Sequence, residues 1–470
     1  MISSSCFRSA VSVASLASFV SFASFVSLAS LAGACGGGST TNLNDQNDKD
    51  AGGSGTGSSH GGGPDATSGG SGSGSGSSDG GGFAKLPSPP QVVDSNPDGG
   101  VIPSASFIAV FFSNDDQSLV PTLEQIYSGM GSSAMWAAGA EYGVGAATAT
   151  NIILTQAAPA TIDDSQNEQG TNTALQTWLL NAISTNLLPA PNGSNIYMLN
   201  YPTTTTVTAN GNQCTDFDGY HEDLQTADGT VFAYGVVPRC TDPGSTPLVT
   251  FSSTVSHEMI EAATDPYPDY NAGWSQADNA HLFFDEANDG SEVADMCEND
   301  PEAYAVFAGF PFTVQRIWSN AQALAGHDPC VPELPNTVFF NSVPELPNTG
   351  LFDYYGSTLD VASVHIPVGG TATVYLDLYS DGVTPDWDVF VQDLNEFDGG
   401  DPSANLLTIT MPGATSGNNG SRIPVTITVK TAGNPMTNGQ VANTEIFGII
   451  SSQGTSDTSP AHYWYGIVTN

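Results

Sequence analysis

Three polar residues within five positions of the chain have the types and the spacing of a metal site. The segment SHEMIEAATDP (256–266) places His257, Glu258 and Glu261 in the pattern H-E-x-x-E. On a helix, residues four apart lie on one face, so His257 and Glu261 can converge on one ion. In the related H-E-x-x-H zinc motif the intervening glutamate is the general base, which makes Glu258 the candidate catalytic residue. The alternative is an ordinary helix on which these side chains face solvent, and the same sequence is compatible with it.

Further ligands are expected from the segment GSEVADMCEND (290–300), which offers Glu292 and Asp295. We expect Glu292 to bind the metal and Asp295 to orient His257, and the reverse assignment stays open. One histidine with two carboxylates would nearly neutralise a divalent ion. Zinc is the first expectation, and such oxygen-rich ligation also admits manganese, iron or calcium.

The elements that must position these residues alternate between strands and helices. Apolar runs predict buried strands at 105–113, 195–202 and 229–238, and apolar residues at helical spacing predict helices at 171–185 and 250–265. Ser252 or Ser253 is expected to cap the second helix, and Pro266 is expected to stop it. This alternation predicts an α/β (α+β) domain over residues 101–334.

The residue pattern of the chain changes after this domain. The heptapeptide VPELPNT occurs at Val331 and again at Val343, and its prolines predict an extended, semi-rigid linker over residues 335–350. Residues 351–470 hold seven short β-rich segments separated by Gly, Asn, Asp and Pro. This pattern predicts an all-β, immunoglobulin-like sandwich, which by itself indicates no function.

The N-terminus has the features of an export signal. Residues 1–34 carry Arg8 as their one charge, followed by a run of small and apolar residues that ends in Ala-Gly-Ala. Cleavage there would leave Cys35 as the first residue, a candidate for lipidation. Residues 35–100 are then expected to form a disordered Gly/Ser-rich tether. A permanent transmembrane helix is the alternative for the apolar run.

Four further cysteines lie in the part of the chain expected to fold: Cys214, Cys240, Cys297 and Cys330. An even number in an exported chain predicts two disulfides, with three pairings possible. The shorter loops favour the pairs Cys214–Cys240 and Cys297–Cys330.

The charge balance excludes one class of partner. The 470 residues include 48 Asp and Glu but only 7 Lys and Arg, for a formal net charge of −41. Nucleic acids and anionic membrane surfaces would be repelled, so any contact with a membrane is expected to run through the lipid anchor alone.

Several segments, in this order, resemble one family. They are CTDFDGYHEDL (214–224), VFAYGVVPRC (231–240), SHEMIEAATDP and SEVADMC (291–297), with AEYGVG (140–145) before them. Together they resemble the bacterial relatives of the EXORDIUM / phosphate-induced protein family. This resemblance implies a secreted, zinc-metallopeptidase-like domain that acts on a peptide or protein substrate.

Two residues outside the helix are candidates for substrate binding. His221 follows Cys214 closely and could contact a substrate or supply a ligand, and Tyr220 could donate a hydrogen bond to an oxyanion. The expected function is thus an exported, surface-anchored metal-dependent hydrolase. The alternative is a non-catalytic cell-surface binding or adhesion protein with a structural metal site.

Overall fold

The structure is a computed structural model that describes residues 86, 88–96, 100–165, 171–209, 211–242, 244–288, 290–354, 357–397, 399–413, 415–432, 444–454 and 461–470. The expected signal peptide, Cys35 and most of the expected tether lie outside these residues. Among the described residues, no helix combines the length and the apolar character that crossing a membrane requires.

A five-stranded sheet forms the centre of the N-terminal part. Its strand order is β3-β2-β5-β9-β8, and only β8 runs antiparallel to its neighbour. The strands are β2 (Ser106–Phe111), β3 (Thr148–Ile153), β5 (Asn195–Tyr201), β8 (Tyr220–Gln225) and β9 (Val231–Pro238). Strands buried on both faces explain the continuous apolar runs of β2, β5 and β9.

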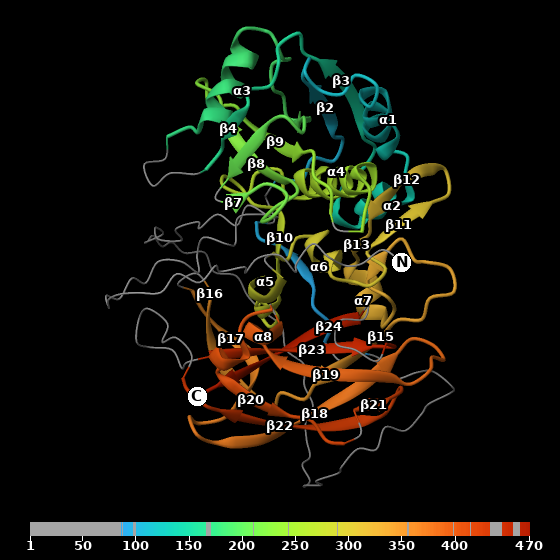
Figure 1. The fold of residues 1–470 in the computed structure, drawn as a ribbon, viewed down its shortest axis with the longest axis vertical. Coiled ribbons are helices and arrows are strands. Elements are labelled where there is room, and N and C mark those ends of the chain that lie inside the picture. The colour runs from blue at the N-terminus through green and yellow to red at the C-terminus, as the bar shows by residue number, and fades with distance from the viewer. Residues whose placement is uncertain are drawn as a thin grey trace, which may run out of the picture.

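Helices cover both faces of this sheet (Figure 1). Successive residues of β2 contribute to different cores: Phe107 packs with α1 (Val120–Met130) and α4 (Pro247–Thr264), and Ile108 packs with α3 (Ala174–Ser184). This alternation is the two-residue period of a strand. The N-terminal part is therefore a three-layer α/β structure.

Helix α4 begins earlier than the sequence predicts. Its N-cap is Thr246, whose side chain accepts a hydrogen bond from the backbone N–H of Val249, and Pro247 occupies the first turn. Ser253, an expected cap, lies inside the helix and donates to the Val249 carbonyl instead. The helix ends at Thr264, two residues before Pro266, as expected.

Smaller elements surround this helix and the sheet. They are β1 (Val92–Asp94), α2 (Ala134–Ala138), η1 (Gly139–Tyr142), β4 (Thr161–Asp163), β6 (Thr206–Ala209), β7 (Gly211–Asn212), β10 (Trp274–Ala277), α5 (Phe283–Asn288), α6 (Asp295–Glu298), β11 (Tyr304–Phe307), β12 (Phe310–Gln315), β13 (Ile317–Trp318), α7 (Asn320–Ala325) and β14 (Cys330–Val331). The hairpin β11–β12 packs against α4. Strand β1 pairs with β10, so this stretch of the expected tether belongs to the folded part.

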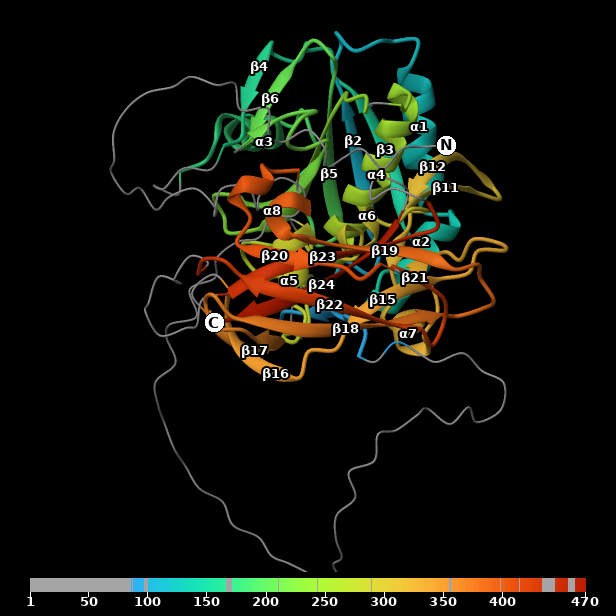
Figure 2. The ribbon, with the colours of Figure 1, turned by 60° about the horizontal axis from the view of Figure 1, so that its bottom comes forward.

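Two sheets form the C-terminal part (Figure 1 and Figure 2). One has the order β15-β18-β22-β20, and the other has the order β16-β17-β24-β23-β19-β21. Their elements are β15 (Phe340–Pro344), β16 (Asn348–Tyr354), β17 (Ser357–His365), β18 (Thr371–Ser380), β19 (Trp387–Asp393), α8 (Leu394–Phe397), η2 (Pro402–Ala404), β20 (Leu407–Thr410), β21 (Ser416–Gly417), β22 (Arg422–Val429), β23 (Thr444–Ser452) and β24 (Ala461–Thr469). The chain is thus mixed α/β and rich in sheet.

The prediction of a linker over residues 335–350 is wrong. This stretch contains β15 and the start of β16, which pair with β18 and β17. Pro344 is tolerated because β15 is an edge strand, where one side of the backbone needs no partner.

The two parts share one apolar core. Phe284 of α5 lies edge-on against Trp464 and Tyr465 of β24, at ring-centroid distances of 5.3 and 5.0 Å. Nearby, His462 Nδ1 lies 3.1 Å from an oxygen of Asp300. The apolar cluster that contains α1 and α4 therefore continues into the C-terminal sheets.

Two disulfides close loops in the N-terminal part. Cys214 pairs with Cys240, and Cys297 pairs with Cys330, which confirms the predicted pairing. Such bonds are consistent with an exported protein.

Candidate metal centre

The polar face of α4 is buried rather than solvated. His257 is 4% exposed, Glu258 2% and Glu261 0%. Strands β8 and β9, the hairpin strand β12 and the segment before α6 surround this stretch of the helix. Because buried charged groups require compensating partners, the solvent-facing interpretation of the motif does not hold.

His257, Glu261 and Asp295 meet at one point. The Nε2 atom of His257 lies 2.7 Å from Glu261 Oε2 and 3.3 Å from Asp295 Oδ1. None of these three atoms makes a hydrogen bond. A histidine nitrogen and two carboxylate oxygens thus converge in a group that could hold a metal ion.

Gln315 holds the histidine ring in place. Its Nε2 donates to the Ala294 carbonyl at 2.8 Å, so its Oε1 is left to accept from His257 Nδ1 at 3.0 Å. When His257 is neutral, its proton is therefore on Nδ1, and Nε2 faces the two carboxylates as a possible ligand atom. The orienting role expected of Asp295 is performed by Gln315, since Asp295 contacts the other nitrogen.

Glu261 is fixed by the backbone. Its Oε1 accepts from the N–H groups of Ala294 and Asp295 at 3.0 and 3.1 Å. These bonds hold the segment that carries Asp295 against α4. They also leave Oε2 as the atom directed at His257.

His221 joins the cluster from strand β8. Its Nδ1 lies 3.7 Å from Glu258 Oε2, and its Nε2 lies 3.7 Å from Glu292 Oε2 and 3.0 Å from the Asp265 carbonyl oxygen. Its side chain is fully buried. Glu292, the expected ligand of the His257 site, therefore groups with His221 and Asp265.

Tyr220 lies on the opposite face of β8. Its hydroxyl donates to Asp164 Oδ2 at 2.7 Å, and its side chain packs in the core beneath α3. Adjacent residues of a strand point to opposite faces, so Tyr220 and His221 cannot serve one site. This placement differs from the substrate-binding role expected of Tyr220.

Mutual proximity shifts the pKa values of the cluster. Burial raises the pKa of Glu292 well above its ordinary value, with neighbouring carboxylates adding to the effect, and burial together with Glu261 raises that of Asp295 to about 6. Burial would lower the pKa of His221, but its contact with Glu258 and the charges around it raise the value to about 9. The protein thus holds several acids together with only histidines to offset them.

No arginine neutralises these acids in the part of the chain that the structure describes. Arg239 pairs with Asp115, Arg316 with Asp300 and Asp328, and Arg422 with Glu345 and Asp377. The ion pairs found for the clustered acids all have histidine as the partner.

A small cavity opens beside the cluster. Its volume is about 30 Å³, and His257, Glu258, Glu298 and Gln315 are among its lining residues. Gly219 also lines it, and a Cβ at this position would lie 2.8 Å from Glu258 Oε1. Burial raises the pKa of Glu298 to about 8. The cavity has room for a water beside Glu258.

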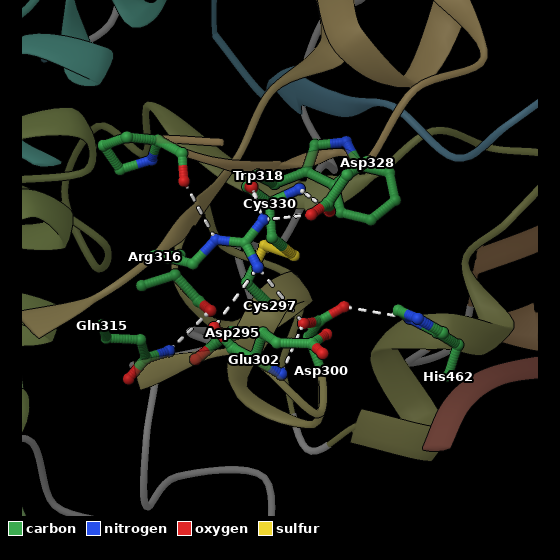
Figure 3. Close-up of a disulfide and its surroundings, with 12 residues drawn as sticks. Asp295, Cys297, Asp300, Glu302, Gln315, Arg316, Trp318, Asp328, Cys330 and His462 are labelled. Carbon is green, nitrogen blue, oxygen red and sulfur yellow. Dashed lines mark hydrogen bonds and ion pairs between the residues drawn. A yellow bond between two sulfur atoms is a disulfide. The ribbon is translucent and has the colours of Figure 1, made fainter. Parts of the chain in front are cut away.

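The Cys297–Cys330 disulfide and Arg316 anchor the segment that carries Asp295 (Figure 3). The guanidinium donates to the carbonyls of Glu302 and Pro332 at 3.3 and 3.2 Å, and also to Cys330 and Asp328. Asp300 also contacts Arg316, and it forms an ion pair with His462 of the C-terminal part. The position of Asp295 is thus fixed from two sides.

No family model, curated protein or solved structure matches the chain. The chemical interpretation of the site therefore rests on its geometry. Seven buried atoms of the cluster lack a hydrogen-bond partner: His221 Nδ1, His257 Nε2, Glu258 Oε2, Glu261 Oε2, Asp265 Oδ2, Glu292 Oε2 and Asp295 Oδ1. Buried polar atoms are normally satisfied, so this set fits a divalent cation.

Sequence reasoning missed two residues of this site. Gln315 reaches His257 across a hairpin, and nothing in its local sequence indicates that role. Asp265 stands directly after α4 in the same segment as the motif, and its position beside the helix end was a usable signal.

Proposed function

We propose that this protein is an exported metal-dependent hydrolase that cleaves peptide bonds, with the metal held by His257, Glu261 and Asp295. The observation that carries the proposal is the convergence of three buried ligand atoms that lack a hydrogen-bond partner, beside the cavity lined by Glu258. Zinc is the first candidate, since it favours histidine with carboxylates in a site of few ligands.

Glu258 acts as the general base. Its Oε2 has no hydrogen-bond partner, and its side chain lines the cavity together with His257. When bound, the ion would supply Lewis acidity toward a substrate carbonyl and a water. Glu258 would take a proton from a water in the cavity, and the peptide would lie across the mouth of the cavity.

The remaining parts of the proposal concern the protein as a whole. The segments described above support membership of the EXORDIUM / phosphate-induced family. The paired C-terminal sheets support an immunoglobulin-like sandwich. The disulfides and the N-terminal sequence support export, with Cys35 as a lipid anchor.

A metal-content measurement tests the site itself. We expect the purified chain to retain a divalent ion after desalting, measured by mass spectrometry, and Glu261→Gln to lose it. The matched control is Asp164→Asn, since Asp164 is equally buried but bonded to the hydroxyls of Thr173, Tyr220 and Tyr234. Metal content that is the same in Glu261→Gln and native protein would refute the site.

A peptide-library digest tests the activity. Native protein is expected to cleave peptides, and Glu258→Gln is expected to retain its metal but lose cleavage by about 10²–10⁴-fold. Equal cleavage by both proteins would exclude the general-base role.

The alternative, a non-catalytic surface protein with a structural metal, is favoured by one observation. All three ligands are at most 4% exposed. It predicts metal binding with no cleavage of any peptide, so the same two experiments separate it from the hydrolase.

A further inference from the structure

A second group of candidate ligands lies beside the first and shares no residue with it. It consists of His221, Asp265 and Glu292, whose ligand atoms lie within 4.8 Å of one another. The three come from strand β8, the end of α4 and the segment before α6. A site assembled from three separate elements is more than the chance clustering of acids along one loop.

Two carboxylate oxygens of this group lack a hydrogen-bond partner, and His221 Nε2 contacts the Asp265 carbonyl oxygen. Asp265 uses Oδ1 to accept from the Gly273 N–H at 2.6 Å, and its Oδ2 has no partner. Glu292 Oε2 also has no partner and lies 3.7 Å from His221 Nε2. All three side chains are at least nine-tenths buried, so bulk water does not reach them.

The Asp265 carbonyl oxygen is a fourth candidate ligand atom, and without an ion it accepts a hydrogen bond from His221 Nε2. It lies 3.0 Å from His221 Nε2. Two adjacent ligands of an octahedral ion, each bound at about 2.1 Å, are separated by about 3 Å. One imidazole with three oxygens is a ligand set suited to manganese and similar ions.

The charge of the cluster, if all its acids are ionised, exceeds what one divalent ion offsets. Glu258, Glu261, Asp265, Glu292 and Asp295 would carry five negative charges, and one divalent ion would offset two of them. The arginines of the described chain are paired elsewhere. Low dielectric makes the uncompensated remainder costly.

We propose that a second divalent cation binds to His221 Nε2, the Oδ2 and carbonyl oxygen of Asp265, and Glu292 Oε2. This site goes beyond the proposed function because it uses none of the ligands assigned there. It leaves Glu258 at the cavity and places the His221 Nδ1–H toward Glu258 Oε2. The rival arrangement has no second ion: Nε2–H donates to the Asp265 carbonyl, and protons neutralise the acids.

The ion count per chain separates these two arrangements. The full exported chain, with both disulfides formed, is stripped with a chelator, loaded with Mn²⁺ and desalted at physiological salt. Bound manganese is counted by mass spectrometry, and electron paramagnetic resonance reports magnetic coupling between neighbouring ions. We expect two coupled ions in native protein, one in Glu292→Gln, one in Glu261→Gln, and two in the control Asp164→Asn.

Each other outcome has a defined meaning. Native protein could hold one ion, which is lost in Glu261→Gln and kept in Glu292→Gln. That result overturns the second site and leaves the proposed function standing. One ion that only Glu292→Gln removes supports the second site and refutes the first. Two ions retained in a folded Glu292→Gln protein also overturn this inference, and the native count decides the matter if the variants do not fold.

Discussion

Replacing Gln315 by methionine tests whether His257 is held ready for a metal. Methionine has a similar length but can neither accept from His257 Nδ1 nor donate to the Ala294 carbonyl, the contacts at 3.0 and 2.8 Å. The ring would then be free to turn and to change tautomer. Ala294 also provides one of the N–H groups that fix Glu261, so the effect reaches two of the three ligands.

The magnitude follows from these contacts. Loss of a partner that orients a ligand weakens metal binding by about 10–100-fold, or about 1.4–2.8 kcal/mol. Two buried polar groups also lose their partners, which costs the fold about 1–3 kcal/mol for each. Folding stability and metal affinity are therefore both lowered, and they must be measured separately.

A competition titration of Zn²⁺ between stripped protein and a chromophoric chelator measures the affinity. The control is Gln176→Met, which breaks the capping box with Thr173 at the start of α3 and so weakens the fold far from the site. We expect its affinity to stay within about twofold of native, as for independent sites. If Gln315→Met binds zinc as tightly as this control, the orienting role is refuted.

Three other perturbations have expected outcomes. Burial opposes the ion pair of His462 and Asp300, but their mutual attraction outweighs it. In the folded protein the pKa of His462 is therefore raised above 6.5 and that of Asp300 is lowered below 3.8. Their ion pair thus stabilises the fold fully between pH 3.8 and pH 6.5. That contribution is lost as pH rises through the folded pKa of the histidine or falls through that of the aspartate. In urea unfolding, His462→Asn should therefore lower the free energy of unfolding less at pH 9 than at pH 5. The opposite trend would contradict the assignment. Replacing Cys297 and Cys330 by alanine opens a loop with a sequence separation of 33. It should cost roughly 4 kcal/mol of unfolding free energy, and an unchanged urea midpoint would contradict this. In Gly219→Ala the added Cβ would lie 2.6 Å from Thr254 Cγ2 and 2.8 Å from Oε1 of Glu258, the proposed general base. This crowding should lower peptide cleavage while the metal content stays native, and full cleavage would contradict the role proposed for Glu258.

The sequence predicts the local part of the site and misses the part that depends on distant contacts. Helical spacing alone places His257 and Glu261 on one face, and the structure brings both to Asp295. The partner on Nδ1 of the histidine comes from β12, far along the chain, and no periodicity identifies it. The strand period could have separated Tyr220 from His221, because neighbours on a strand face opposite sides.

The same distinction holds for the fold. Apolar runs located strands β2, β5 and β9 of the central sheet but not β3 and β8, and loop length favoured the correct disulfides. Proline content misled at residues 335–350, because an edge strand accepts a proline that a central strand would not. Whether a strand lies at the edge of a sheet depends on how the sheet assembles, so the local sequence does not predict it.

The shared core around Phe284 determines how this protein can be divided in the laboratory. A gene fragment that stops at residue 334 would bring Phe284 into water and remove His462 from Asp300, which also contacts Arg316. Such a fragment would expose an apolar face next to the segment that carries Asp295, and aggregation is its expected fate. The C-terminal sheets therefore act as part of the folding unit of the candidate metal centre, and we expect that they cannot be deleted or exchanged as an independent domain.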